Sequence, residues 1–279
     1  MTGRTKQEPI TQNYGKYRYV KHLSQGSFGR VVLATVRCEA ASTLFAKRTD
    51  PSYALKIIPS KFNTTNEINI LKDIQYIHGV VQYIDMFKIE NNVVIVTEFC
   101  KGQELFNYIN NEGPLSEKTT KYIFKQLCIA IQIVHTKGIV HRDLKPENII
   151  INDQYIVTII DWGFAFYPSK TTERESCGSP NYAAPEILVK NIQYGSEVDV
   201  WSLGCILYAM LTGLLPFDND NISEIFNSIV ACSVDYDNTK LSEEAIDLLR
   251  SIFTMDNRIT ITEILNDRWL NPDICIDWH

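Results

Sequence analysis

The chain has 279 residues, of which 45% are hydrophobic, enough for one large domain or two lobes. Its net charge of −6 argues against a general nucleic-acid binder. An acidic surface suits a basic partner or peptide, although a charge this small more often serves solubility alone. Seven cysteines without a C-x-x-C pair predict neither a disulfide framework nor a zinc site. We find no apolar signal core and no apolar run near the ~20 residues of a membrane span. We therefore expect an intracellular protein, cytoplasmic or nuclear, that contacts neither membrane nor nucleic acid.

The first part of the chain has the pattern of a small sheet. Residues 1–14 are polar and are predicted to form a loose tail. Alternating polarity predicts five mostly antiparallel strands, at 17–23, 30–34, 53–58, 80–87 and 92–99. Helical periodicity predicts one helix at 63–77. We expect this lobe to span 15–99 and a hinge to follow at 100–103.

The rest of the chain has helical periodicity. Helices are predicted at 105–109, 117–137, 198–212, 222–230, 243–253 and 260–267. The segment 198–212 is hydrophobic nearly all round, which predicts a helix buried in the core of a large lobe. We expect this helical lobe to span 104–270, with a short tail at 271–279, and the whole fold to be α+β.

Two stretches of the sheet lobe carry chemically suggestive residues. Gly26 and Gly29 lie between two strands, where glycine lets backbone N–H groups approach phosphate oxygens. A two-glycine hairpin is, however, more often an ordinary turn. Lys56 lies inside an apolar strand. An exposed strand lysine is the simpler interpretation, and a buried lysine paired with Glu67 is the functional one.

The segment 141–148, His-Arg-Asp-Leu-Lys-Pro-Glu-Asn, carries the densest chemistry of the chain. It places Asp143, Lys145 and Asn148 within eight residues, between the apolar runs 139–140 and 149–151. Two short buried strands flanking a polar turn would hold these side chains at one face. The arrangement suits a base, a cation and a metal ligand acting near one point.

Taken in chain order, these motifs resemble a eukaryotic serine/threonine protein kinase catalytic domain over roughly residues 17–270. The matching set also includes Asp161-Trp162-Gly163, Ala184-Pro185-Glu186 and the segment 199–204. The segment 177–186 resembles the calmodulin-dependent and AMP-activated-type group. The resemblance implies a two-lobed fold, ATP and Mg²⁺ as cofactors, protein substrates with Ser or Thr hydroxyls, and a monomer.

The resemblance also assigns catalytic roles. Asp143 is expected to orient the substrate hydroxyl and accept its proton. Lys145 is expected to neutralise charge on the transferring γ-phosphoryl group. Lys56, held by Glu67, is expected to contact the α- and β-phosphates.

A larger set is expected to bind nucleotide and metal. Val31, Ala54 and Ile150 would sandwich adenine, and Asn148 and Asp161 would ligate Mg²⁺. The complete set of expected nucleotide-binding residues is Ser24, Gln25, Gly26, Ser27, Phe28, Gly29, Val31, Ala54, Lys56, Thr97, Glu98, Cys100, Glu104 and Ile150.

The stretch between Asp161-Trp162-Gly163 and Ala184-Pro185-Glu186, which the resemblance identifies as the activation segment, departs from the family pattern. Glu175 stands where relatives carry a Thr that must be phosphorylated, and Arg142 normally binds that phosphate. A carboxylate that pairs with Arg142 would give a kinase active without an upstream kinase. The alternative is an exposed Glu175 with control elsewhere, at Ser176, Thr171 or Thr172.

Other activation-segment and substrate residues follow from the same resemblance. Glu186 is expected to form a buried ion pair with Arg258, and the pairing of Lys145 with Ser179 marks a serine/threonine rather than a tyrosine kinase. Glu104 is expected to bind an Arg three residues before the phosphosite, with Glu147 joining that acidic patch.

A pseudokinase that binds ATP as a scaffold is the competing interpretation. Ser24 in place of a glycine, Trp162 in place of the usual Phe and the short connection from Lys56 to Glu67 favour it. The four residues most needed for phosphotransfer are nevertheless present, namely Lys56, Asp143, Asn148 and Asp161.

Overall fold

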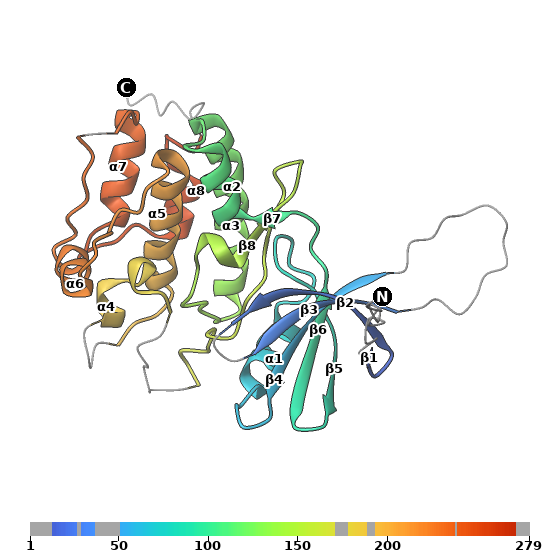
Figure 1. The fold of residues 1–279 in the computed structure, drawn as a ribbon. Helices are drawn as coiled ribbons and strands as arrows, with labels where there is room; N and C mark the ends of the chain where they lie inside the picture. Colours follow the sequence, from blue (N-terminus) through green and yellow to red (C-terminus); the bar gives the residue numbers. More distant parts are fainter. Residues whose placement is uncertain are drawn as a thin grey trace, which may run out of the picture. The chain divides into compact units, whose positions relative to one another are not determined.

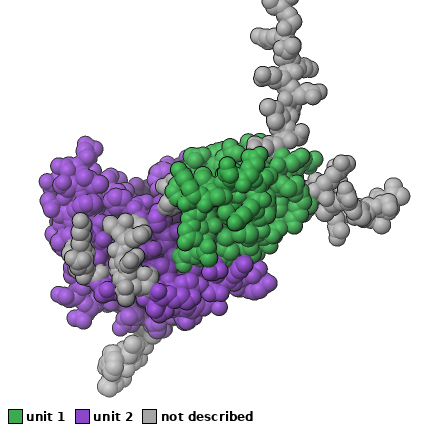
Figure 2. Space-filling model, turned by 90° about the horizontal axis from the view of Figure 1, so that it is seen from below, with its two compact units in different colours: residues 1–68, 82–99 green, residues 69–81, 100–279 purple. Residues whose placement is uncertain are grey.

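The structure is a computed structural model, and it describes residues 13–26, 29–36, 51–170, 178–188, 193–237 and 239–271. The chain forms two compact units, which Figure 2 colours separately. Unit 1 comprises residues 1–68 and 82–99, and unit 2 comprises residues 69–81 and 100–279.

Unit 1 is built on one sheet whose strands all pair antiparallel, in the order β1-β2-β3-β4-β6-β5 (Figure 1). The strands are β1 (Asn13–Tyr14), β2 (Tyr17–Gln25), β3 (Arg30–Thr35), β4 (Ser52–Pro59), β5 (Tyr83–Ile89) and β6 (Asn92–Glu98). All five predicted strands are present. The prediction of a loose tail up to residue 14 is wrong at its end, because Tyr14 is buried in the core cluster and brings β1 into the sheet.

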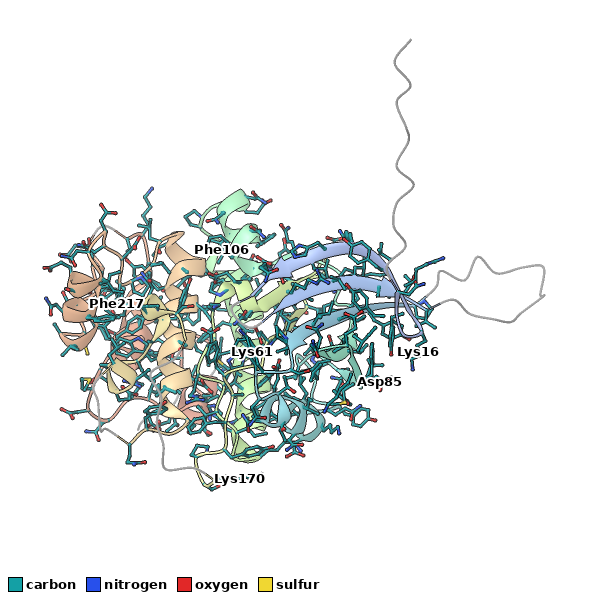
Figure 3. All side chains as sticks on the ribbon, turned by 60° about the horizontal axis from the view of Figure 1, so that its bottom comes forward. Lys16, Lys61, Asp85, Phe106, Lys170 and Phe217 are labelled. Carbon is teal, nitrogen blue, oxygen red and sulfur yellow. The ribbon has the colours of Figure 1, made fainter. Side chains whose placement is uncertain are left out.

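Strand alternation gives the two faces of this sheet different characters. Val32, Leu55 and Val96 belong to the buried cluster on one face. Their sequence neighbours, which point the other way, include Val31 paired with Lys56 and Ala54 paired with Thr97. An ion pair joins the turn between β1 and β2 to β5, with Lys16 Nζ 3.2 Å from Asp85 Oδ2 (both labelled in Figure 3).

Helix α1 (Thr65–Asp73) begins in unit 1 and ends in unit 2. It is shorter than the predicted 63–77. Ile74 and Ile77 continue the apolar pattern and are buried, but they lie in a turn in which Tyr76 adopts a φ of 69°. The apolar spacing therefore identifies buried residues beyond the end of the helix, and the predicted helix is too long for that reason.

Unit 2 is mainly helical (Figure 1). Its helices are α2 (Leu105–Glu112), α3 (Glu117–Thr136), α4 (Pro185–Leu188), α5 (Glu197–Thr212), α6 (Ile222–Val230), α7 (Glu243–Ile252) and α8 (Ile261–Leu265). As predicted from its sequence, α5 is buried along almost its whole length, and it contacts both α3 and α7. Trp201 of α5 stacks on Phe217 at 5.3 Å between ring centroids, and Phe217 is labelled in Figure 3.

A second, three-stranded sheet in unit 2 carries the functional loops. Its strands are β7 (Gln103–Glu104), β8 (Ile149–Ile151) and β9 (Val157–Ile159). The apolar run 149–151 is a strand as predicted. Val140 of the run 139–140 instead forms an isolated bridge with Phe166. Within the described residues, no helix is long and apolar enough to span a membrane.

Candidate active site

The carboxylate of Asp143 is the centre of a polar network in unit 2. Its Oδ2 lies 2.9 Å from Lys145 Nζ and accepts a hydrogen bond from Asn148 Nδ2 at 3.0 Å. Its Oδ1 accepts from the backbone N–H of Ser179 at 3.1 Å. Lys145 Nζ also donates to Ser179 Oγ at 2.9 Å. With Asp143 only 6% exposed, these donors fix the direction of its carboxylate.

The sequence folds locally to give this arrangement. Pro146 opens a single 3-10 turn, Pro146–Asn148, and this turn returns Asn148 toward Asp143. Gly178 has a φ of +89°, and a Cβ at that position would lie 2.7 Å from the Arg142 carbonyl oxygen. Glycine therefore lets the activation segment approach the segment 141–148, called the catalytic loop below, closely enough for Ser179 to reach Asp143.

The backbone of the catalytic loop is anchored by Asp199, a residue whose role the sequence did not indicate. This fully buried carboxylate accepts the N–H groups of His141 and Arg142 at 2.8 and 2.9 Å, and it lies 2.8 Å from His135 Nε2. Burial raises the pKa of Asp199, but hydrogen bonding and charge from His135 outweigh burial and leave that pKa below its usual range. The buried Asp199 carboxylate thus holds two consecutive residues of the loop.

The side chain of Arg142 is held by aromatic residues of the same unit. Its Nε donates to the Phe164 carbonyl at 2.8 Å, and its Nη1 donates to the Tyr194 hydroxyl at 3.3 Å. The guanidinium lies 4.2 Å from the centroid of the Phe166 ring. Glu175, the predicted partner of Arg142, lies outside the described residues.

The start of the activation segment is also tied to helix α1. The Tyr167 hydroxyl donates to Asp73 Oδ2 at 2.6 Å, and burial together with this bond raises the pKa of Tyr167. Asp73 is the last residue of α1, the helix whose first turn carries Glu67. No pattern in the sequence indicated this contact, because the two residues are 94 positions apart.

In unit 1, Lys56 and Glu67 form an ion pair. Lys56 Nζ lies 2.6 Å from Glu67 Oε1, and the two side chains are 20% and 10% exposed. The sheet face that carries Lys56 also carries Val31, Ala54 and Thr97, as their register requires. Four of the expected nucleotide-binding residues therefore share one surface.

The glycine-rich turn is described in part. Gly29 lies against β4, and a Cβ there would come within 2.2 Å of the Ile57 carbonyl oxygen, so a side chain at this position would clash. The Gly26 N–H donates to the Gly29 carbonyl at 2.8 Å, which closes the turn after Ser24 and Gln25. Ser27 and Phe28 lie outside the described residues.

The remaining expected nucleotide-binding residues lie at the ends of short strands. Glu98 ends β6, and its N–H donates to the Gln82 carbonyl at 3.0 Å. Cys100 follows it. In unit 2, Ile150 of β8 pairs with Glu104 of β7.

The donor set suits a hard cation such as Mg²⁺. Asn148 uses its Nδ2 to donate to the Asp143 carbonyl and carboxylate, which leaves its Oδ1 as an oxygen ligand. Asp161 accepts the Gly163 N–H with Oδ1 at 3.1 Å, which fixes the carboxylate on its loop. An amide oxygen and a carboxylate are ligands that Mg²⁺ prefers. Both residues therefore fit the metal that the sequence predicted.

Trp162, next to Asp161, is fully buried. Its ring centroid lies 4.6 Å from that of His141. Neither Trp162 Nε1 nor His141 Nε2 has a hydrogen-bond partner in the described part of the chain. Among the described residues, the large ring is therefore held by packing rather than by a hydrogen bond from its indole N–H.

An acidic pair lies near the catalytic loop. Glu147 Oε2 is buried without a hydrogen-bond partner among the described residues, and burial raises the pKa of Glu147. Glu104 is close enough for its charge to raise that pKa further. Glu104 Oε2 accepts from Asn107 Nδ2 at 3.2 Å. A buried carboxylate oxygen without a partner lowers the stability of the fold, so its presence calls for an explanation.

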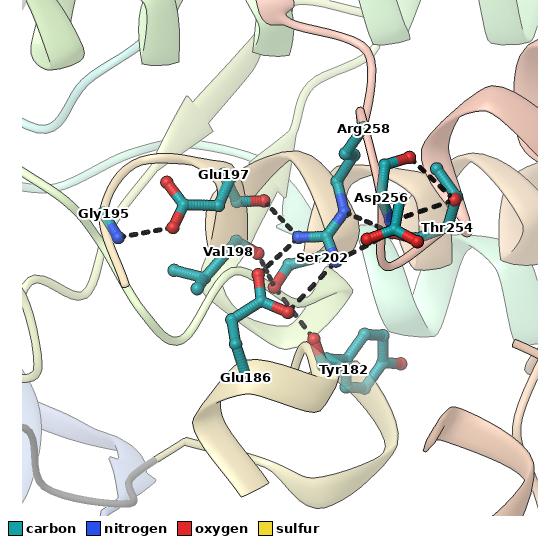
Figure 4. Close-up of polar contacts among 9 residues, drawn as sticks. All are labelled: Tyr182, Glu186, Gly195, Glu197, Val198, Ser202, Thr254, Asp256 and Arg258. Atoms are coloured by element: carbon teal, nitrogen blue, oxygen red, sulfur yellow. Dashed lines mark hydrogen bonds and ion pairs between the residues drawn. The ribbon is translucent and has the colours of Figure 1, made fainter. Parts of the chain in front are cut away.

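The predicted ion pair between Glu186 and Arg258 is present as a fork of two contacts (Figure 4). Arg258 Nη2 donates to Glu186 Oε2 at 3.1 Å, and the side chains are 5% and 10% exposed. Arg258 also donates to the carbonyls of Glu197 and Thr254 and lies 4.9 Å from the Trp201 ring centroid. It therefore joins the end of the activation segment to α5.

The two-unit fold and the network around Asp143 define a protein kinase. Comparison with known sequences agrees: residues 17–270 match the protein kinase domain, and the chain belongs to that family. It is 38% identical to the carbon catabolite-derepressing protein kinase of Candida tropicalis, over 93% of this chain and 42% of that protein.

Two further relatives place the chain within the family. It is 37% identical to the SNF1-related protein kinase catalytic subunit alpha KIN12 of Arabidopsis thaliana, over 91% of this chain and 51% of that protein. It is 36% identical to the SNF1-like protein kinase ssp2 of Schizosaccharomyces pombe, over 96% of this chain and 46% of that protein. The predicted resemblance to AMP-activated-type serine/threonine kinases is confirmed. The chain spans about half the length of these curated relatives.

Proposed function

We propose that the chain is an active kinase that transfers the γ-phosphoryl group of ATP to Ser or Thr hydroxyls of protein substrates. The network of Asp143, Lys145 and Ser179 is the observation that supports it most directly. A carboxylate held by three donors is a fixed acceptor for the substrate hydroxyl proton. A lysine bonded to both the carboxylate and Ser179 sets a cation beside that acceptor.

Each side chain then has one task. Asp143 orients the hydroxyl in line with the phosphoryl group, and Lys145 stabilises the charge that develops on its oxygens. Lys56, oriented by Glu67, binds the α- and β-phosphates. Asn148 Oδ1 and the Asp161 carboxylate would hold Mg²⁺, which when bound neutralises charge on the β- and γ-phosphates.

Phosphate transfer to a generic serine peptide tests this proposal. Asp143→Asn should lower kcat by roughly 10²–10⁴-fold, since it removes the proton acceptor. The same variant should still show an ATP-dependent rise in melting temperature with Mg²⁺, because its nucleotide-binding residues are intact. A wild-type protein that is stabilised by MgATP but transfers no phosphate would instead be a pseudokinase scaffold.

We further propose that substrates carry an Arg three residues before the phosphosite. The buried, unpartnered Glu147 Oε2 with Glu104 nearby supports this, because a guanidinium would supply the missing donors. A peptide with Arg at this position should have a kcat/KM on the order of tenfold above that of its Ala counterpart. The preference should shrink in Glu104→Gln and Glu147→Gln. A preference for Pro or acidic residues would contradict it.

The third part of the proposal is that Glu175 replaces a phosphorylated Thr. Arg142 retains N–H groups beyond those bonded to Phe164 and Tyr194, so it has donors for a carboxylate. Protein made in bacteria and treated with phosphatase should therefore be active, and Glu175→Gln should lower its kcat. Activity that appears only after treatment with another kinase would contradict this part alone.

A further inference from the structure

Tyr155, in the loop between β8 and β9, is held in a backbone conformation that tyrosine rarely adopts. Its φ is 59°, in the left-handed region that favours glycine. Three local bonds enforce it: the Tyr155 N–H donates to the Asn152 carbonyl, Asn152 Oδ1 accepts the Ile156 N–H, and Gln126 Nε2 donates to the Tyr155 carbonyl at 2.9 Å. Strain of this kind, held by surrounding bonds, is a common feature of binding sites.

The strained residue forms one wall of a cavity. The cavity has a volume of about 440 Å³, and Tyr155, Tyr108, Gln103 and Asp153 are among the residues that line it. The rings of Tyr108 and Tyr155 meet edge to face with centroids 6.2 Å apart. Hydrogen bonding with Tyr155 raises the pKa of Tyr108 to about 12. Tyr155 itself remains 40% exposed, so its ring is accessible from solvent.

The one charged residue among the described residues that line this cavity is acidic, namely Asp153. Asp153 forms no ion pair with another described residue, and neither does Glu112, which lies one helical turn after Tyr108 on α2. Glu112 is close enough for its charge to raise the pKa of Tyr108. None of the described residues that line the cavity is a Lys or an Arg, and Lys101 precedes the lining residue Gly102 in sequence. Two aromatic rings beside a carboxylate form the environment in which a guanidinium binds well.

We propose that this cavity is a docking site for an arginine side chain in a linear basic segment of a partner protein. The site is distinct from the proposed substrate-arginine site. Gln103 lines the cavity, whereas its neighbour Glu104 lies near Glu147, and adjacent residues of a strand point to opposite faces. The net charge of −6, like the acidic Asp153 in the cavity, favours a basic partner.

The test measures binding, so its outcome does not depend on phosphate transfer. The probe is a fluorescein-labelled peptide of alternating Gly and Arg, without Ser, Thr or Tyr, added to the Glu104→Gln/Glu147→Gln protein to silence the other acidic site. Tyr155→Gly should raise its Kd by roughly fivefold through loss of the ring face. Asp153→Asn should raise it by roughly threefold. The charge-matched control Glu244→Gln, on the exposed side of α7, should leave Kd within about twofold.

Two further measurements make the proposal refutable. A peptide with citrulline in place of Arg should bind at least fivefold more weakly; equal binding would overturn the proposal. Glycine is favoured at the left-handed position, so Tyr155→Gly should melt at or above the wild-type temperature. Unchanged Kd in Tyr155→Gly, or a melting temperature several degrees lower, would assign the ring to hairpin packing and overturn the docking role.

Discussion

The guanidinium of Arg142 stacks on the ring of Phe166, with 4.2 Å between the guanidinium carbon and the ring centroid. Phe166 is itself fixed beside the catalytic loop, because its backbone exchanges two hydrogen bonds with Val140, at 3.0 and 2.9 Å. The first residues of the activation segment are therefore bound to the loop that carries Asp143 through backbone and side chain together.

Replacement of Phe166 by Leu should lower kcat by roughly three- to tenfold while leaving the KM for ATP little changed, because a cation–π contact worth about 1 kcal/mol orients Arg142. Steady-state kinetics on a peptide substrate measure this. Tyr236→Leu removes a similar contact, because Arg250 lies 5.5 Å from the centroid of the Tyr236 ring. Both residues are far from the catalytic loop in the sequence. This control should retain wild-type kcat. Equal kcat losses in both variants would mean that the effect is general destabilisation.

The hydrogen bond from Tyr167 to Asp73 should support the position of α1. Tyr167→Phe removes only the hydroxyl and should lower kcat by about threefold to tenfold, the effect of one bond to a charged group. Asp73→Asn should show a similar loss, and the double variant should lose little more, because both changes break the same bond. Additive losses would show that the two residues act separately. Tyr122→Phe, at a tyrosine 51% exposed on α3, is the matched control.

The ion pair between Arg258 and Glu186 should matter chiefly for stability. Arg258→Ala leaves a buried carboxylate without its partner and should lower the free energy of unfolding by roughly 3–5 kcal/mol. Urea denaturation at neutral pH measures the loss. Arg268→Ala breaks an ion pair with Asp247 in which the two side chains are 61% and 51% exposed. This variant should change the free energy of unfolding by less than about 1 kcal/mol. Similar losses in both variants would contradict burial as the cause.

The buried carboxylate of Glu147, which we propose recognises substrate, should lower the free energy of unfolding by an amount that depends on pH. Burial raises the pKa of its carboxyl group, so folding disfavours the charged form. The destabilisation is therefore present at neutral pH and disappears as the pH falls through the folded-state pKa toward the usual value near 4.5, where the group is neutral. Glu147→Gln should raise the free energy of unfolding by about 1 kcal/mol at pH 7.5 and by less at pH 4.5.

Urea titrations at the two pH values measure this difference between Glu147→Gln and wild type. Glu224→Gln, on the exposed first turn of α6, should show no such pH dependence. A gain that is the same at both pH values, or a loss at neutral pH, would contradict the assignment of Glu147 as an unsatisfied buried charge.

The sequence alone predicted the parts of this protein whose geometry is local. Asp143, Lys145 and Asn148 meet because a single turn separates them. The segment 198–212 was predicted to be buried because it is hydrophobic nearly all round, and α5 is buried along almost its whole length. The ion pair of Glu186 with Arg258 was also predicted, but from family resemblance rather than from spacing.

Tertiary structure decided the contacts between residues far apart in the chain. Asp199 binds the catalytic loop across 58 residues, and Tyr167 reaches Asp73 across 94. The Tyr194 hydroxyl that bonds Arg142 lies 52 residues away. No periodic pattern in the sequence predicts contacts between residues so far apart, because these contacts depend on how helices and strands pack. The sequence therefore determined which side chains carry the chemistry, whereas packing determined what holds them in place.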